Sequence, residues 1–353
     1  MAVKALVSTR KGLFIYRRSG QRWEMGTTHF AGTPVTLSFY EPREKAIYAA
    51  LRHGHFGPKL HRSDDGGGEW IEIATPDFPV EADAKPTLKQ VWAFAAASDG
   101  TLWAGGIPAG VFKSQDKGES WQFVQSLWDV PDRGRWGGGG YDESGLHSIV
   151  CDPRDARHVL VAISSGGVWE TRDAGKSWQV RTKGMYAVYA PPEQKFDPAI
   201  QDPHRMVHCP AEPEVMWIQH HNGVFRSADG AAEWQELNPP ISNFGFAVAA
   251  HPSRTETAWF VPAHSDQRRE PVDGRVVVNR TDDGGKSFMT LSHGLPGEQA
   301  YDLVYRHGLA VDESGERLAM GSTTGGLWFS GDGGESWTMA TARLPPIYAV
   351  DFA

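Results

Sequence analysis

The chain has 353 residues and a formal net charge of −8, and 40% of its residues are hydrophobic. It contains no run of about 18 apolar residues, which argues against a membrane-spanning helix, and no clustered basic stretch, which argues against a nucleic-acid partner. The 14 Trp and 40 Gly residues suggest a turn motif that is repeated many times.

One pattern, Ser/Thr-x-Asp-x-Gly-x-x-Trp, recurs along the chain. In chain order, copies span residues 63–70, 114–121, 171–178, 227–234, 281–288 and 330–337, and an eroded copy ends earlier at Trp23. Two copies deviate, with Ala231 at the glycine position of one and Phe288 as the closing aromatic residue of another. Successive closing aromatic residues are 47 to 57 positions apart. Seven such units predict an all-β fold, a seven-bladed β-propeller with four antiparallel strands in each blade.

Each motif is expected to form the hairpin turn between the third and fourth strands of a blade. The Ser/Thr hydroxyl and the Asp carboxylate can accept hydrogen bonds from backbone N–H groups within the turn. The glycine can adopt a positive φ. The motif carboxylates therefore receive a structural role. The closing aromatic residue is expected to fill the gap to the neighbouring blade.

The remaining strands follow in the same order in every unit. First strands are expected near residues 35–40, 147–151, 206–209 and 245–250, each followed by a turn and a second strand. The chain starts with second-strand residues and finishes with 347–352, which has the pattern of a first strand. The C-terminal strand should therefore complete the N-terminal blade and remove a free sheet edge. On this interpretation residues 1–353 form a single domain.

The repeated turns resemble the Asp-boxes of the BNR/Asp-box repeat superfamily, whose sialidase-like members include propellers of the WD40-YVTN-BNR type. The superfamily also includes xyloglucanase-type glycosidases, sortilin-like receptors and photosystem-assembly factors. The resemblance implies the propeller fold and leaves function open, because its members do unrelated things on one scaffold. Sialidases have six blades, an Arg-Ile-Pro segment and three arginines that clamp a carboxylate. The chain has seven units and no Arg-Ile-Pro, so sialidase activity is not expected.

Loops that lead into first strands and loops that join second to third strands share one face of a propeller, around its axis. Two loops leading into first strands, residues 124–145 and 180–204, are unusually long, which favours a functional role. Several histidines also fall on this face. Imidazole is a common ligand of divalent metals, and some propeller lyases hold a metal with histidines. We therefore predict a divalent metal site, for Zn or Mn, with the ligands His147, His204, His220 and His264.

Further residues of the same loops are candidates for chemistry and for substrate binding. His221, Tyr141, Asp142 and His307 are predicted to act as general acids or bases or as polar contacts. Substrate contacts are predicted from Trp136, His53, His55, Tyr186 and Arg268.

The function that these features favour is a hydrolase or lyase acting on a small polar or carbohydrate substrate. Two alternatives remain open. One is a noncatalytic protein-binding scaffold. The other is a metal-independent glycoside hydrolase, which needs two facing carboxylates drawn from Asp142, Glu143, Asp197, Asp266, Glu298 and Asp302.

The two cysteines and the N-terminus bear on the compartment. Cys151 and Cys209 each lie in an apolar strand, so they are expected to be reduced core thiols. The apolar stretch after Met1 is too short for the core of a signal peptide. We therefore expect a cytoplasmic protein.

Overall fold

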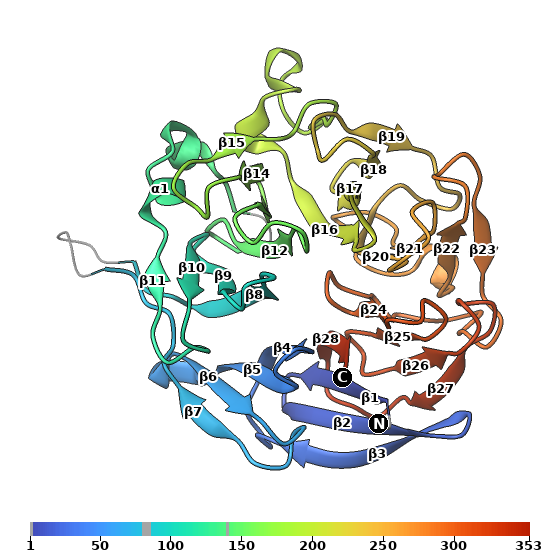
Figure 1. The fold of residues 1–353 in the computed structure, drawn as a ribbon. Helices are drawn as coiled ribbons and strands as arrows, with labels where there is room; N and C mark the ends of the chain where they lie inside the picture. The colour runs from blue at the N-terminus through green and yellow to red at the C-terminus, as the bar shows by residue number, and fades with distance from the viewer. Residues whose placement is uncertain (1–2, 80–85, 139–140) are drawn as a thin grey trace.

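The computed structural model describes residues 3–79, 86–138 and 141–353, and within them seven four-stranded antiparallel sheets surround a central axis (Figure 1). The seven-bladed β-propeller expected from the sequence is therefore confirmed. Consecutive first strands contact one another around the whole ring, from β4 through β8, β12, β16, β20 and β24 to β28 and back to β4.

The strands of each blade follow one another outward from the axis. The first strands are β4 (Val35–Glu41), β8 (Gln90–Ala96), β12 (Leu146–Cys151), β16 (Pro203–Cys209), β20 (Gly245–Ala250), β24 (Leu309–Val311) and β28 (Ile347–Phe352). The second strands are β1 (Lys4–Thr9), β5 (Ala46–Arg52), β9 (Leu102–Ile107), β13 (Val159–Ile163), β17 (Glu212–His220), β21 (Ala258–Pro262) and β25 (Leu318–Gly321).

The outer strands are shorter in most blades. The third strands are β2 (Gly12–Ser19), β6 (Pro58–Ser63), β10 (Val111–Ser114), β14 (Gly167–Thr171), β18 (Gly223–Ser227), β22 (Val278–Thr281) and β26 (Leu327–Ser330). The fourth strands are β3 (Arg22–His29), β7 (Ile71–Ile73), β11 (Gln122–Phe123), β15 (Gln179–Val180), β19 (Gln235–Leu237), β23 (Met289–Leu291) and β27 (Thr338–Thr341). The helix α1 (Gln125–Trp128) and short 3₁₀ turns lie in the loops, and none of the described helices is long and apolar enough to cross a bilayer.

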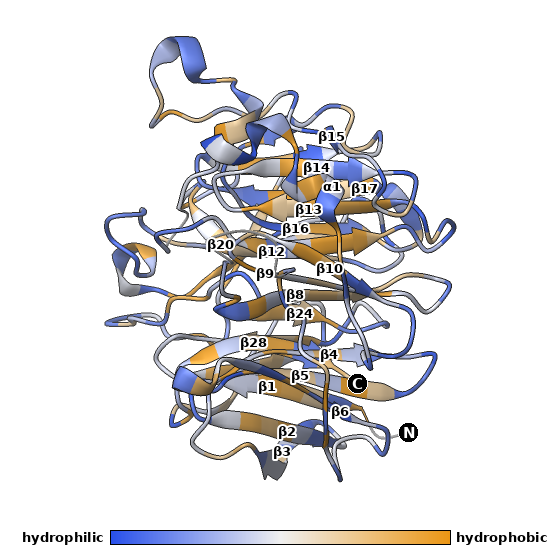
Figure 2. Ribbon diagram, turned by 90° about the vertical axis from the view of Figure 1, so that its left-hand side faces the viewer, coloured by the Kyte–Doolittle hydropathy of each residue, from blue (hydrophilic) through white to orange (hydrophobic). Residues whose placement is uncertain are grey.

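The C-terminal strand closes the ring as predicted. β28 pairs antiparallel with β1, with Val350 opposite Val7. Reciprocal backbone hydrogen bonds join Lys4 and Ala353, at 2.8 and 2.9 Å. Both chain ends therefore lie on one face of the disc, and long loops extend from the opposite face (Figure 2).

The six repeated turns share the hydrogen bonds expected from their sequence. In the first, the Gly67 N–H group donates to the Ser63 hydroxyl at 2.8 Å, and the same hydroxyl donates to Asp65 at 2.8 Å. Equivalent bonds to a Ser or Thr hydroxyl recur in the other five turns at 2.8–3.0 Å. Each motif carboxylate also accepts backbone N–H groups, so its role is to hold the turn.

The core lies mainly between adjacent blades. Trp103 of β9, for example, is fully buried and packs in one cluster with Leu146 and Trp169 of the next blade. Closing aromatic residues also bridge blades, since the Trp121 indole donates to the Ala74 carbonyl at 2.9 Å. Both cysteines are buried and free, as expected. Burial raises the pKa of Cys151 to about 12, which makes it an inert core thiol.

The first strands carry a repeated irregularity that matters for the site. In β4, β8, β12, β16 and β20 the pairing with the second strand shifts register near the start of the strand. One residue is skipped in each of these pairings, and the skipped residues are Thr36, Trp92, His147, His204 and Phe246. Such bulges redirect a side chain and are frequent beside binding sites. Four of these five side chains contribute to the site described below.

A buried ion-pair network stabilises the blade of β12 to β15 on the turn side. The His158 ring lies 3.1 Å from Asp152 and 2.7 Å from Glu170 through its two nitrogens. The Glu170 carboxylate raises the pKa of His158 against the opposing effect of burial, and Asp152 adds to the rise. A protonated His158 can donate to both carboxylates at once.

We expect this network to make stability depend on pH. Because the folded-state pKa of His158 is raised, its contribution is complete below the unfolded value near 6.5 and is lost as the pH rises through the folded value. His158→Gln should lower the free energy of unfolding by about 1–2 kcal/mol at pH 6 and by less at pH 9. Urea denaturation at several pH values measures the difference, with exposed His264→Gln as the control. A wild-type-to-variant difference that does not change with pH would contradict this assignment.

Candidate functional site

A cavity of about 230 Å³ opens at the axis, on the face of the long loops. Its walls come from the starts of first strands, from the end of β5, from the loop between β21 and β22 and from the loops preceding β12 and β24. The lining residues are Thr36, Arg52, Gln90, Trp92, Tyr141, Arg269, Tyr305, Arg306, His307 and Tyr348. We call this space the mouth cavity.

Arg306 is the most buried cation of the mouth cavity. Its side chain is 8% exposed, and its guanidinium lies 4.8 Å from the ring centre of Trp92 and 5.4 Å from that of Phe246. Its Nε has no hydrogen-bond partner. Burial lowers the pKa of Arg306 to about 10, and Asp202 opposes that shift. Arg306 therefore remains charged at neutral pH inside a largely desolvated wall.

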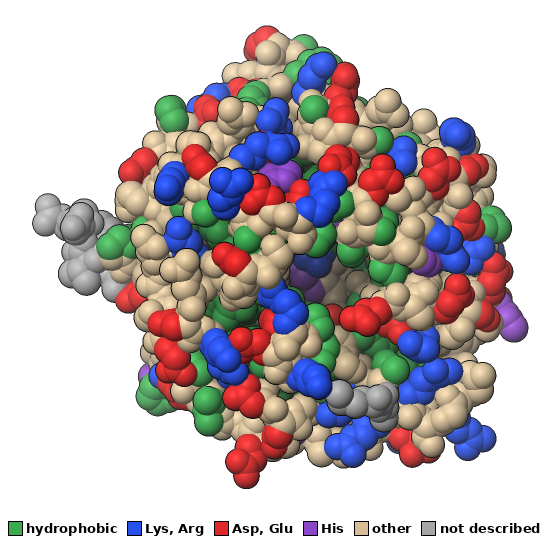
Figure 3. Space-filling view, in the orientation of Figure 1, with side chains coloured by type: hydrophobic (Ala, Val, Ile, Leu, Met, Phe, Trp, Pro, Cys, Tyr) green, Lys and Arg blue, Asp and Glu red, His purple; other side chains and the backbone are tan. Residues whose placement is uncertain are grey.

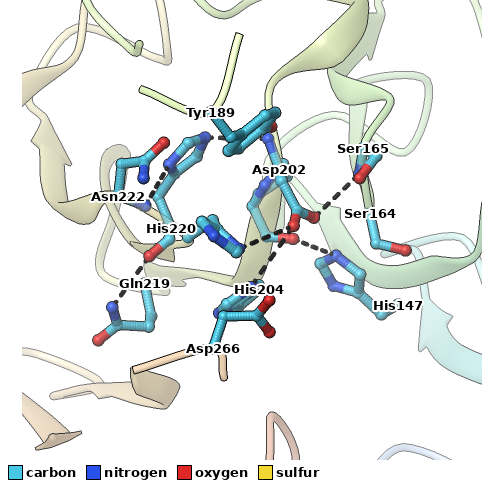
Figure 4. A network of polar contacts seen from close by, with 12 residues as sticks. His147, Ser164, Ser165, Tyr189, Asp202, His204, Gln219, His220, Asn222 and Asp266 are labelled. Atoms are coloured by element: carbon cyan, nitrogen blue, oxygen red, sulfur yellow. Dashed lines mark hydrogen bonds and ion pairs between the residues drawn. The ribbon is translucent and has the colours of Figure 1, made fainter. Parts of the chain in front are cut away.

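Beside this cavity, Asp202, His204 and His221 form a group whose ligand atoms all lie within 4.8 Å of one another. The Asp202 Oδ2 atom is 3.6 Å from His204 Nε2 and 3.4 Å from His221 Nδ1. Figure 4 shows the Asp202 carboxylate pointing toward the ring of His204. Asp202 precedes β16, His204 lies at its bulge and His221 follows β17, so all three occupy the face of the mouth cavity.

The tautomer of His204 is fixed by the backbone. Its Nδ1 atom lies 2.6 Å from the Gly245 carbonyl oxygen, which can only accept, so Nδ1 carries the proton. In the neutral ring, Nε2 then carries a lone pair, and this atom faces the Asp202 carboxylate. Burial lowers the pKa of His204, with Asp202 opposing. A lone pair and a carboxylate that face each other are complementary to a cation between them.

Asp202 is itself held by two hydrogen bonds. Its Oδ1 accepts the Ser165 N–H at 2.9 Å, and its own N–H donates to His220 Nε2 at 3.0 Å (Figure 4). Burial opposes ionisation, but His204, His221 and Arg306 hold the pKa of Asp202 well below its usual range. The carboxylate is therefore ionised and oriented in advance.

Phe246 connects the group of Asp202, His204 and His221, which we call the metal-type group, with residues that line the mouth cavity. Its ring stacks on His204, with centroids 4.6 Å apart and planes at 15°. The guanidinium groups of Arg306 and Arg269 lie 5.4 and 5.6 Å from the centre of the same ring, and Tyr305 packs edge-on at 5.0 Å. The two features are therefore neighbouring parts of one region.

Of the four predicted metal ligands, the structure brings only His204 into this group. His147 Nε2 donates to the Pro203 carbonyl at 2.7 Å, and its Nδ1 lies 2.9 Å from the Ser148 hydroxyl. Both ring nitrogens of His220 lie next to backbone N–H groups, those of Asp202 and Asn222, and the neutral ring can accept from one of them. Burial lowers the pKa of His220 to about 3. These rings are occupied by protein contacts, so they support the site without reaching a ligand. His264 is exposed and lies outside the group.

The predicted acid–base residues are divided between the two parts of the site. His221 belongs to the metal-type group, and Tyr141 and His307 line the mouth cavity. His307 Nε2 donates to the His147 carbonyl at 2.9 Å, and burial holds its pKa well below the usual range, so it serves as a fixed neutral wall. Asp142 is exposed and does not line the cavity.

The residues predicted to contact substrate lie away from both the mouth cavity and the metal-type group. Trp136 is buried against Trp169, and Tyr186 packs on Phe225 with its hydroxyl on Glu236, next to an outer strand. The remaining three, His53, His55 and Arg268, are exposed on loops, where the histidine rings pack on Phe56 and Arg268 pairs with Glu270.

Sequence reasoning did not select Asp202, Arg306 or Trp92. One available signal for Asp202 was its spacing, because residues two apart in an extended strand point to the same side and His204 was already a candidate. No pattern in the sequence indicates that Arg306 and Trp92 lie close together, because they belong to separate blades.

A second axial cavity opens on the opposite face, where the chain ends lie. Figure 3 shows that face hollowed at its centre, with basic and histidine side chains inside. The cavity measures about 440 Å³, and its polar lining includes Arg205, His208 and Asp351. His307 borders both cavities. The candidate site is therefore confined to the loop face by this residue and its neighbours.

Comparisons with known proteins support the fold. No family model matches the chain. An oligoxyloglucan-reducing end-specific xyloglucanase of Emericella nidulans is 22% identical over 245 residues, which is 60% of this chain and 29% of that protein. The chain therefore matches less than a third of the length of this curated relative.

Comparisons with solved structures also support the fold. An ancestral GH74 enzyme superposes with a TM-score of 0.61 at 15% identity, covering 90% of this chain and 38% of the other. YCF48 from Cyanidioschyzon merolae has a TM-score of 0.58 at 12% identity, covering 88% and 87%. YCF48 bound to a D1 peptide has a TM-score of 0.54 at 16% identity, covering 87% and 81%. At these identities the similarity concerns the seven-bladed scaffold.

The placement of the histidines predicts different effects of their removal. His147→Ala should lower the free energy of unfolding by about 2–4 kcal/mol, because it opens a cavity and leaves the Pro203 carbonyl without its donor. His264→Ala, at an exposed position, should change it by less than about 0.5 kcal/mol. Urea denaturation compares the two. Equal stability of both variants would contradict the structural role of His147.

Proposed function

We propose that this protein is a metal-assisted hydrolase or lyase that acts on a small polar or carbohydrate substrate at the mouth cavity. The observation that carries the proposal is the arrangement of Asp202 Oδ2, His204 Nε2 and His221 Nδ1, three ligand atoms from two adjacent segments at one point of the loop face.

The distances favour shared coordination over direct hydrogen bonding. The contacts at 3.4 and 3.6 Å exceed the usual hydrogen-bond range of about 2.7–3.2 Å. Zn–ligand bonds of about 2.0–2.2 Å in a tetrahedron place two ligand atoms about 3.4 Å apart. The donation from His204 Nδ1–H to Gly245 also matches the outer contact that orients metal-binding histidines. A 2-His, 1-carboxylate set suits zinc, with manganese as the second choice.

Each group of the site then has a defined task. A bound divalent cation would act as a Lewis acid or lower the pKa of a water molecule. Asp202, His204 and His221 would hold it. Tyr141 places a phenol hydroxyl on the cavity wall, where it can move a proton to or from the substrate. Trp92 on the lining and Phe246 next to it place apolar rings around the Arg306 guanidinium.

The choice of a carbohydrate substrate draws on the comparisons. The curated relative is a xyloglucanase and one structural neighbour is a GH74 enzyme. A metal-independent glycosidase mechanism needs two facing carboxylates, and none of the described residues that line the mouth cavity is Asp or Glu. This favours metal assistance over that alternative.

A protein-binding scaffold is the second candidate function. It is favoured by apolar side chains exposed on the loop before β16, where Val188 and Phe196 are 62% and 67% exposed. YCF48, a neighbour in fold, has been solved with a bound peptide. A stable protein partner that requires these two side chains, together with no metal binding, would favour this candidate.

Metal binding is the decisive measurement for the proposed enzyme. Protein purified without a histidine tag should contain or take up close to one Zn²⁺ or Mn²⁺ per chain, as determined by elemental analysis and calorimetric titration. Asp202→Asn and His204→Ala should each reduce the affinity by at least about tenfold. Substitution with Co²⁺ should give the visible absorption of a site with nitrogen and oxygen ligands.

His264→Ala serves as the matched control, since this exposed histidine lies outside the group, and it should bind metal like the wild type. Hydrolysis or elimination of carbohydrate substrates should require the metal and fail in the Asp202 variant. Protein that binds neither ion, or that binds equally well in all three variants, would overturn the proposal.

A further inference from the structure

The mouth cavity is positively charged. Three arginines line it, Arg52, Arg269 and Arg306, and its described lining contains no carboxylate. Arg269 is neutralised locally, because its guanidinium lies 2.5 Å from Asp266 Oδ1. Among the ion pairs of the described residues, none involves Arg52 or Arg306. Two cationic side chains therefore face the cavity without a paired anion.

Because Arg306 is buried, the lack of a paired anion beside its guanidinium destabilises the folded protein. A desolvated charge without a partner destabilises a fold unless an interaction compensates for it. The aromatic faces of Trp92 and Phe246 compensate in part, yet the Nε atom has no partner. Asp202 attracts Arg306 through space, but its own carboxylate is directed to His204 and His221. Arg306 therefore retains donors that can be used by a ligand.

The other walls supply hydrogen-bonding groups around these two arginines. Tyr141, Tyr305 and Tyr348 bring phenol groups to the lining, and Gln90 brings an amide. Arg52 lies close enough to Tyr348 to act on its pKa, which burial raises. Guanidinium groups bind carboxylate and phosphate oxygens with two parallel N–H donors, and phenol hydroxyls can complete the shell of such an oxyanion.

We propose that the mouth cavity binds the oxyanion of an acidic sugar, a carboxylate or a phosphate, through Arg306 and Arg52. This inference rests on the proposed function in one respect, namely that the same cavity takes the substrate. It differs from the xyloglucan specificity named for the curated relative, because a neutral sugar would leave both arginines unpaired. The cavity of about 230 Å³ is below the range of about 300–1,000 Å³ that holds drug-sized ligands, so the acidic unit is a monosaccharide.

Binding of small probes to metal-free protein tests this inference directly. The chain is treated with a chelator, and calorimetric titration compares glucuronate, glucose 6-phosphate and neutral glucose at low ionic strength. Glucuronate or glucose 6-phosphate should bind at least tenfold more tightly than glucose, and the stronger of the two identifies the oxyanion. High salt should weaken this binding, as expected for charge pairing.

Variants separate the cavity from the rest of the surface. Arg52→Gln should weaken binding of the preferred acidic probe at least tenfold, and Arg306→Lys should do so as well if it folds. Arg268→Gln is the matched control, because Arg268 is exposed and pairs with Glu270 outside the cavity, and it should bind like the wild type.

The outcomes distinguish the two proposals. Failure of both acidic probes to bind, glucose binding as tightly as they do, or an equal loss in the Arg52 and Arg268 variants would each overturn the acidic-sugar inference. Metal uptake by Asp202, His204 and His221 would remain valid in that case. Acid binding without any metal uptake would instead leave the cavity assignment standing and remove the metal-assisted reaction.

Discussion

The pairing of β28 with β1 is the contact on which the site depends. It joins the two ends of the chain in one sheet and removes the free edge of an open ring. Closure holds the seven first strands side by side around the axis. Only in that arrangement can Tyr348 near the C-terminus, Arg52 near the N-terminus and Arg306 line a single cavity. The mouth cavity therefore forms only because the ring of blades is closed.

Within the ring, register shifts in the first strands bring polar and aromatic side chains to the site. The register shift near the start of five first strands displaces one residue in each, and four of these contribute to the site. Thr36 and Trp92 line the mouth cavity, His204 joins the metal-type group, and Phe246 packs on His204 and lies near Arg306. The fifth displaced residue, His147, supports the region from behind through the Pro203 carbonyl. A regular ladder would have paired these positions and directed their side chains into the blades.

Charge is distributed unevenly across this small region. A carboxylate with two imidazoles lies beside Phe246 through His204, and the guanidinium groups of Arg306 and Arg269 lie near the same ring. The first part is complementary to a cation and the second to an anion. In a water-poor setting each charge acts more strongly than it would at the surface, so the two parts together would orient a polar substrate that carries an acidic group.

The sequence alone determined the repeat number, the four-stranded blades, the turn hydrogen bonds and the closing C-terminal strand. The turn bonds of Ser63, Asp65 and Gly67 span only four residues, so their pattern is visible in the residues themselves. The repeat number and the unpaired strand pattern at the C-terminus follow from counting these units along the chain. The sequence also indicated the loop face and selected His204, His221, Tyr141 and His307, which the structure places in the metal-type group or on the lining of the mouth cavity. It could not rank the histidines, because the occupancy of the His147 and His220 rings depends on Pro203, Asp202 and Asn222.

Only the tertiary structure decided which side chains meet. Asp202 and Arg306 lie about a hundred positions apart, and Arg52 is farther still from Arg306. Their positions follow from bulges, loop paths and ring closure, which depend on packing between blades and leave no periodic trace in the sequence. For the same reason, Trp136, Tyr186 and Arg268 appeared suitable by type and loop, yet Trp136 packs on Trp169 of β14, Tyr186 packs on Phe225 of β18 and Arg268 is exposed beside Glu270.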